Sequence, residues 1–275
     1  QATELLVNLG ARMLDIVLHE LNYTYTKLAD ADGGDTIVGI GWPIVRDLTN
    51  MLFIIILVYI GLTTALRLGG YEVKKILPLL IGVALLINFT PLVIGFIVDA
   101  SNIVMNFFIG NLHPGDYFKF HQGIERSIIP PSIWGNLNPF TNIDNLISAL
   151  ALVITDLLIF CVLLAFFLLF LARYIAIRIL VILSPLAFAC AILPATKKYF
   201  KQWWDQLIQW CIVGVSGAFF LYLGTQMFGV MGTPSGGAYT NSSDFLGTLM
   251  PMITIVIVFF AGLMTALSTS AMGAK

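Results

Sequence analysis

Charged residues are scarce in this chain. Lys, Arg, Asp and Glu make up only 11% of its 275 residues, whereas 59% are hydrophobic and the mean hydropathy is +0.93. A soluble domain usually carries about a quarter charged residues. The composition therefore excludes an ordinary soluble globular protein.

Residues and motifs that serve enzyme chemistry are scarce as well. Cys161, Cys190 and Cys211 all lie in apolar stretches, so we expect them to pack rather than to form disulfides. Neither the G-x-x-x-x-G-K-[ST] loop nor G-x-G-x-x-G occurs, so the chain should not hydrolyse nucleotides itself. Gly214–Gly217 matches the short G-x-S-G pattern of a serine nucleophile, but the histidines that could act as its base lie in predicted outer segments. We predict no catalytic residue, no cofactor and no metal site.

Long apolar stretches, by contrast, fill most of the chain. A helix rises about 1.5 Å per residue, so a stretch of about twenty residues crosses a hydrocarbon core about 30 Å thick. The sequence predicts an all-α fold, a multi-pass transmembrane helical bundle with about five spans. Residues 1–36 would form an outer amphipathic helix and linker, and residues 37–275 the transmembrane domain. The five stretches are Leu48–Leu66, Ile76–Val98, Leu146–Leu171, Gln206–Gly229 and Phe245–Leu267.

The positive charges predict an orientation with the amino terminus outside and the carboxyl terminus inside. Cations favour the cytoplasmic side of a membrane. The chain opens on Gln1 rather than methionine, so either a signal peptide was removed, which agrees with this orientation, or the chain is incomplete. Nine of the fourteen Lys and Arg residues would then lie inside: Arg67, Lys74, Lys75, Arg173, Arg178, Lys197, Lys198, Lys201 and Lys275.

A sixth apolar stretch, Tyr174–Leu193, contains Arg178 and Pro185. If it crossed the membrane fully, Lys197 and its neighbours would move outside and the charge bias would be lost. Proline removes a backbone donor and breaks a helix. We therefore predict a re-entrant or interfacial segment that breaks at Pro185, within an inner basic region over residues 172–205.

Helix boundaries can be predicted at three further places. Glu4–Leu21 has helical apolar spacing and should form an amphipathic helix, on the outer membrane face or against a partner. Trp42-Pro43 should open the first span, since proline suits the first helical position.

The second stretch continues as a helical pattern to about Gly110, which is too long for one untilted crossing. It should bend at Pro91 or project beyond the bilayer.

Polar residues inside the apolar pattern are candidates for function. Asp99, Asn102 and Asn106 share one helix face, which either lines a water-filled path or faces the outer aqueous phase. Asp156 lies near the middle of Leu146–Leu171 with only apolar residues three and four positions away. An acidic residue there costs about 2.5–3.5 kcal/mol on insertion. It should face a lumen, pair with another helix or stay protonated.

Two further groups of residues indicate contacts between helices or chains. Small residues let helices approach closely in a membrane, and Gly214, Gly217 and Ala218 fit that pattern. The outer loop, residues 111–145, carries an unusually apolar set that should dock on the membrane, the bundle or another protein. Those loop residues are Pro130, Pro131 and Trp134.

One segment, from Arg173 to Trp204, carries several motifs in a fixed order. An arginine-bearing apolar helix is followed by Ser-Pro-Leu-Ala-Phe, by Ile-Leu-Pro, by a basic patch and by paired tryptophans; the segment reads RYIAIRILVILSPLAFACAILPATKKYFKQWW. It resembles the TrbL-like proteins, the polytopic inner-membrane channel components of bacterial type IV secretion and conjugation systems. The GWPIVRDLTNMLFIIILVYIGL stretch and the order of the spans are similar too.

The resemblance implies a non-enzymatic subunit of an envelope-spanning translocator that moves DNA or protein across the bacterial inner membrane. It would assemble with copies of itself and other secretion-system subunits, with separate ATPases supplying energy. The alternative class is a small secondary transporter or ion channel with a proton-sensitive Asp156. The resemblance carries six positions into an inner-face partner segment: Arg173, Arg178, Pro185, Pro194, Trp203 and Trp204.

Lys197, Lys198 and Lys201 complete that inner-face segment, because cations and tryptophans suit an inner interface that a cytoplasmic partner could grip. Ordinary anchoring to lipid headgroups explains the same residues.

Overall fold

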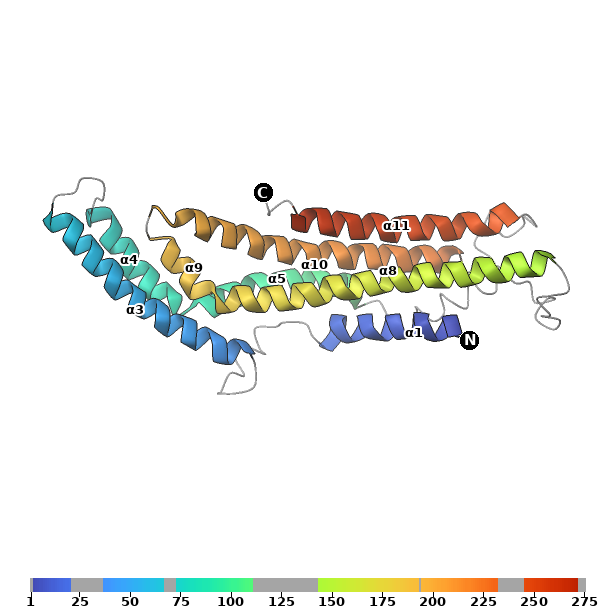
Figure 1. The fold of residues 1–275 in the computed structure, drawn as a ribbon, viewed down its shortest axis with the longest axis horizontal. Coiled ribbons are helices and arrows are strands. Elements are labelled where there is room, and N and C mark those ends of the chain that lie inside the picture. The colour runs from blue at the N-terminus through green and yellow to red at the C-terminus, as the bar shows by residue number, and fades with distance from the viewer. Residues whose placement is uncertain are drawn as a thin grey trace. The chain divides into compact units, whose positions relative to one another are not determined.

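The computed structural model describes residues 2–20, 37–66, 73–110, 143–192, 194–231 and 245–271 (Figure 1). Every regular element in these ranges is a helix. The linker within residues 21–36, the outer-loop residues Pro130, Pro131 and Trp134, and the side chain of Asp156 lie outside the described residues. The elements are α1 (Ala2–Asp15), η1 (Ile16–Glu20), α3 (Ile37–Ala65), α4 (Val73–Ile87), α5 (Thr90–Ile109), α8 (Ile143–Ile182), α9 (Ser184–Cys190), α10 (Lys197–Met231) and α11 (Phe245–Ala271).

The predicted all-α, multi-pass fold is confirmed. Within the described ranges four segments are long and apolar enough to cross a membrane: Ile37–Ala65, Thr90–Ile109, Leu157–Ile182 and Lys197–Gln226. The predicted second span is broken by a turn, and its part in α4 is a shorter apolar helix, Leu77–Ile87. The predicted fifth span falls in α11, whose described apolar part is Val256–Ala266.

The chain divides into two compact units. The first comprises residues 1–22, 103–172 and 213–269, and the second comprises residues 23–102, 173–212 and 270–275. In the first unit α1 packs on α8, since a Cβ added at Gly10 would lie 3.3 Å from the Phe160 ring. The amphipathic helix predicted at this end thus covers part of its own chain, with Val7, Ala11 and Leu14 buried.

Small residues set the helix contacts elsewhere in the first unit. A Cβ added at Gly217 of α10 would lie 3.1 Å from Phe170 of α8. A Cβ at Gly224 would overlap the Phe259 ring of α11, and one at Gly262 of α11 would overlap Phe220. Gly214 and Ala218 are buried on α10 as well. Glycine therefore allows α8, α10 and α11 to approach closely.

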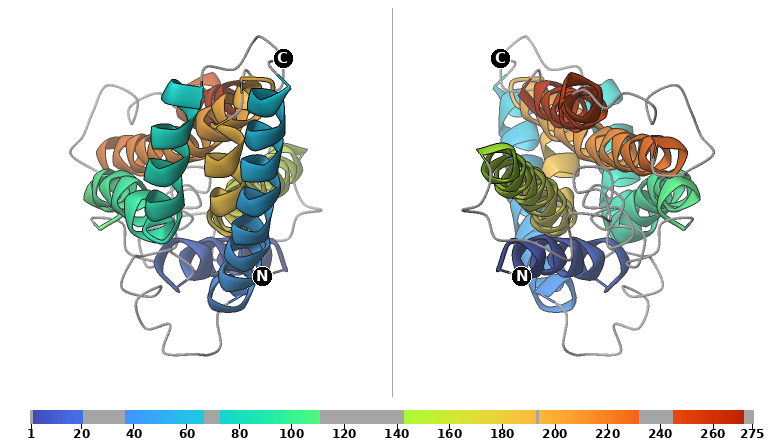
Figure 2. Two further views of the ribbon diagram at one scale, coloured as in Figure 1. Left: turned by 90° about the vertical axis from the view of Figure 1, so that its left-hand side faces the viewer. Right: turned by 90° about the vertical axis from the view of Figure 1, so that its right-hand side faces the viewer.

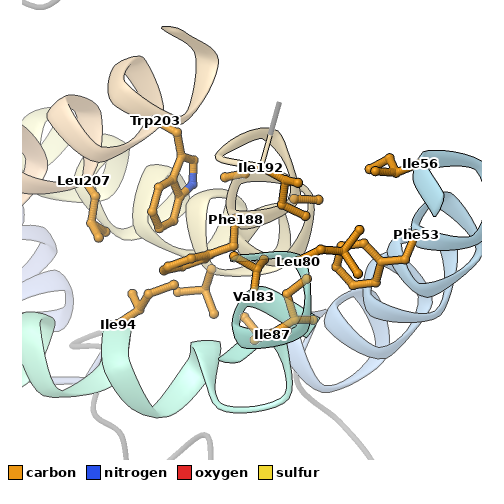
Figure 3. Close-up of a cluster of buried hydrophobic side chains, with 14 of the residues drawn as sticks. Phe53, Ile56, Leu80, Val83, Ile87, Ile94, Phe188, Ile192, Trp203 and Leu207 are labelled. Atoms are coloured by element: carbon orange, nitrogen blue, oxygen red, sulfur yellow. The ribbon is translucent and has the colours of Figure 1, made fainter. Parts of the chain in front are cut away.

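The second unit is built on one apolar cluster to which α3, α4, α5, α8, α9 and α10 contribute. Helices α3 and α4 lie side by side (Figure 2), and α9 packs against both. Phe188 of α9 lies near the middle of the cluster (Figure 3). The outer face of α3 stays exposed and apolar, with Ile44, Met51 and Val58 each more than 60% exposed. An aliphatic surface of this kind suits lipid rather than water.

Two helix breaks share one local design. Proline has no N–H, so the carbonyl four residues earlier loses its helical donor. At the α8–α9 break, Pro185 leaves the Val181 carbonyl without that donor, and the Ser184 hydroxyl donates to it at 2.6 Å. At the α4–α5 break, Thr90 before Pro91 donates to the Ile87 carbonyl at 2.9 Å. A hydroxyl before the proline replaces the missing backbone donor in both cases.

These breaks confirm the predicted bend near Pro91 and the predicted break at Pro185, but two predicted boundaries are wrong. Tyr174–Ile182 is not a separate segment: α8 continues through it without interruption for 40 residues, about 60 Å at 1.5 Å per residue. Nothing in that stretch breaks a helix before Pro185. The first span also begins earlier than Trp42-Pro43, because α3 starts at Ile37 and contains Pro43 in its interior.

Candidate functional site

Two polar groups stand out among the otherwise apolar helices of the second unit. The first is an exposed basic–aromatic face made of Lys197, Lys198, Phe200, Lys201 and Trp204. The second is a buried arginine cluster made of Arg173, Ser101 and Asn102 with the backbone carbonyls of Trp210 and Cys211.

The basic–aromatic face lies on the first two turns of α10, directly after the turn that follows α9. Thr196 donates its hydroxyl to the Cys190 carbonyl at 2.8 Å and accepts from the Tyr199 N–H through its own carbonyl at 2.9 Å. These bonds fix the direction in which α10 starts. Lys197, Lys198 and Lys201 are exposed.

Aromatic packing holds the floor of this face in place. Phe200 stacks on Trp203 with ring centroids 6.1 Å apart, and both rings contact Phe188 of α9, at 5.4 Å and 5.6 Å. Trp203 is only 8% exposed, and its indole N–H donates to the Leu180 carbonyl of α8 at 3.1 Å. The paired tryptophans therefore have different roles: Trp203 is a core residue, whereas Trp204 remains half-buried beside the lysines.

An open pocket of about 470 Å³ is lined by the five residues of the face. Its walls are almost entirely apolar, and three of its five lining residues are lysines. The salt bridge between Arg46 and Asp47 lies on α3 rather than at this face, and the first turn of α10 contains no acidic residue. Three cations thus lie at a helix amino terminus, where the helix dipole is already positive.

Arg173 does not belong to this exposed face, although the sequence groups it there. Its side chain is 4% exposed. The guanidinium donates to the Trp210 carbonyl at 3.2 Å, to the Ser101 hydroxyl at 3.4 Å and to the Asn102 amide oxygen at 2.9 Å. Ser101 in turn donates to the Cys211 carbonyl at 2.9 Å. A single side chain of α8 thereby joins α5 to α10.

The remaining inner-segment residues have diverse surroundings. Arg178 is half-buried, and its guanidinium lies over the Tyr174 ring, 3.8 Å from the centroid. Its buried Nε has no hydrogen-bond partner among the described residues. Pro185 is buried in the first turn of α9, whereas Pro194 is exposed in the turn before α10. The predicted segment therefore combines interior and surface residues.

The predicted polar stripe on α5 is not uniform either. Asn102 is 3% exposed and bound to Arg173, whereas Asn106 is exposed and Asp99 is half-buried. Sequence reasoning missed Ser101, which neighbours Asn102 and holds two of the bonds in the arginine cluster. Ser101 does not lie on the polar face of α5, so the sequence pattern did not indicate its role. In the part of the chain that the structure describes, no three His, Cys, Asp or Glu side chains gather as metal ligands.

Comparison with known protein families places part of this chain in one of them. Residues 132–267 match the family model described as TrbL, the TrbL/VirB6 plasmid conjugal transfer protein. The match includes all of α9 and α10 and therefore both the basic–aromatic face and Arg173. No curated protein matches the chain.

Proposed function

This chain is a TrbL-like membrane protein, and from that premise we propose that it is an inner-membrane channel or scaffold subunit of a type IV secretion-like machine. The family match indicates a component of a conjugal transfer system. The finer role is our inference: the subunit helps DNA or protein to cross the bacterial cell envelope, together with further copies of itself and other subunits.

The observation that carries the proposal is the position of the family match. It covers the part of the chain in which long apolar helices, a buried arginine and an exposed basic face occur together. The matched family is described as a conjugal transfer protein, and we propose a structural rather than an enzymatic role for this chain. Since the sequence holds no nucleotide-binding loop, we propose that separate ATPases supply the energy.

We further propose how the chain is used in the machine. The inner-face segment, with Lys197, Lys198 and Lys201 exposed, would lie at the cytoplasmic boundary, beside the cytoplasmic subunits. Asp156, Asp99 and Asn106 would face polar seams or a lumen between helices or copies, because a carboxylate in a span needs such surroundings. The apolar outer-loop residues Pro130, Pro131 and Trp134 would pack between copies.

A gene-deletion and complementation experiment tests the proposal. Deleting the gene should abolish transfer of the DNA or protein cargo without changing growth, and the wild-type gene should restore transfer. Asp156→Asn should keep the protein in the membrane but reduce transfer, and Asp156→Lys should reduce it further. If transfer persists in the deletion strain while uptake of an ion or small solute is lost, the chain is a transporter instead.

A further inference from the structure

We propose that the pocket of the basic–aromatic face binds one anionic phospholipid, with its phosphate on the lysines and an acyl chain over Phe200 and Trp204. The inference rests on the proposed crossing of the membrane by α10 but not on any role in transfer.

The charges at the start of α10 call for an anion. Lys197, Lys198 and Lys201 lie within the first two turns, at the positive end of the helix dipole, where cations are unfavourable. No described acidic side chain forms a salt bridge with them. A phosphate among the three ammonium groups would offset that unfavourable arrangement. An anion is therefore the expected ligand.

The pocket walls indicate that this anion is attached to an apolar body. A site for free phosphate would surround it with polar donors, but this pocket is lined by the aromatic rings of Phe200 and Trp204 and by the lysine stems. Because Phe200 is stacked on the buried Trp203, the apolar floor is rigid before any ligand arrives. A phospholipid has both parts, a charged phosphate and a chain that covers aromatic carbon.

The position of the pocket along α10 favours a lipid over a protein segment. The crossing-length segment Lys197–Gln226 has 30 residues, about 45 Å at 1.5 Å per residue, against a hydrocarbon core of about 30 Å. The charged first turns therefore lie at the headgroup level, and Asp205 is the last charged residue before the apolar run. A pocket of about 470 Å³ is within the size range of small-ligand sites. Lipid headgroups are present at that level in every membrane.

Native mass spectrometry of the purified full chain tests this proposal. The detergent-solubilised protein is titrated with dioleoylphosphatidylglycerol and, separately, with zwitterionic dioleoylphosphatidylcholine. We expect one phosphatidylglycerol to bind more tightly than further copies, and no such first site for phosphatidylcholine. The triple variant Lys197→Gln, Lys198→Gln, Lys201→Gln should lose affinity at this first site by on the order of 100-fold, since each lysine near an anionic lipid surface contributes about fivefold.

Two matched controls separate a specific site from general charge attraction. The variant Arg67→Gln, Lys74→Gln, Lys75→Gln removes the same charge from another predicted inner region and should change the first affinity by less than about twofold. Trp204→Ala should weaken phosphatidylglycerol binding, whereas Phe96→Ala, which removes an exposed aromatic ring of α5 that does not line the pocket, should not.

Each result decides the inference. Equal loss in both triple variants would show nonspecific attraction and overturn it. Binding of sn-glycerol 3-phosphate with the same affinity as the lipid would reduce the site to a phosphate site and overturn the acyl-chain assignment. Unchanged lipid binding with loss of co-purifying subunits in the Lys197, Lys198, Lys201 variant would assign the face to a protein partner. A chain that binds the lipid but has no effect on transfer would contradict the proposed function alone.

Discussion

The Arg173 guanidinium donates a hydrogen bond to the Asn102 amide oxygen at 2.9 Å, and both side chains are almost completely buried. A second bond from Arg173 reaches the Trp210 carbonyl of α10. A buried cation is expensive in an apolar interior unless several acceptors surround it. Ser101, Asn102 and Trp210 supply such acceptors, so the charge of α8 fixes two other helices.

Arg173→Gln should lower the unfolding temperature of the detergent-solubilised protein by on the order of 5 °C, because hydrogen bonds to charged groups contribute about 1.5–3 kcal/mol each. Arg173→Lys should not restore it, since an ammonium cannot reach acceptors on two helices as the guanidinium fork does. Helix melting followed by circular dichroism measures the effect. Arg46→Gln, the same change in an exposed pair, should shift the melt by about 1 °C or less. Equal shifts for the two variants would mean that the bonds of Arg173 in the buried arginine cluster do not stabilise the fold.

Ser184→Ala should destabilise the second unit by about 1–3 kcal/mol, because the Val181 carbonyl would lose its remaining side-chain donor. In a Pro185→Ala background the same change should have a much smaller effect, since the alanine restores a backbone N–H four residues after Val181. Denaturant unfolding of the four proteins of this cycle measures the coupling. Ser216→Ala removes a similar hydroxyl bond, to Val213, with no proline after it, and should show little effect. If the effects of Ser184→Ala and Pro185→Ala are additive, the Ser184 hydroxyl does not replace the backbone donor that Pro185 lacks.

Gly224→Ala and Gly262→Ala should both destabilise the first unit, because the new Cβ atoms would overlap Phe259 and Phe220. Gly61→Ala on α3 has nothing within 4 Å of its new Cβ. It should be neutral or stabilising by up to about 1 kcal/mol, from helix propensity alone. The loss of helix on heating, followed by circular dichroism for the wild type and each variant, measures the change in stability. Stabilisation by all three substitutions would mean that the α10–α11 contact is not formed.

Cysteines introduced at Gly237 and Lys198 should be labelled from opposite sides of the membrane, as the uneven division of the cations predicts. Impermeant maleimide applied to intact cells should reach only position 237. Lysed cells, in which both positions react, serve as the control for reactivity. Labelling of both positions in intact cells would place the basic–aromatic face outside and overturn the orientation.

Much of the fold could be predicted because membrane crossing imposes a length and a composition on each helix. Pro91 and Pro185 indicated breaks that the structure has, since a missing N–H is a local property. The continuity of α8 through Arg173 was missed, because an arginine usually ends a span and only acceptors from α5 and α10 make it tolerable inside. For the candidate site, the sequence grouped Lys197 and Trp204, which line one pocket. It could not separate Trp203 from Trp204, because the burial of Trp203 depends on packing with α9.

The central claim is that this chain acts as one of several subunits in a transfer machine, and co-purification tests it most directly. The tagged chain would be extracted gently from native membranes, its mass measured and its bound proteins identified. We predict a multi-copy complex that retains other transfer subunits, including an ATPase. A uniformly monomeric species with no bound protein, able to move ions or solutes alone in liposomes, would contradict the claim.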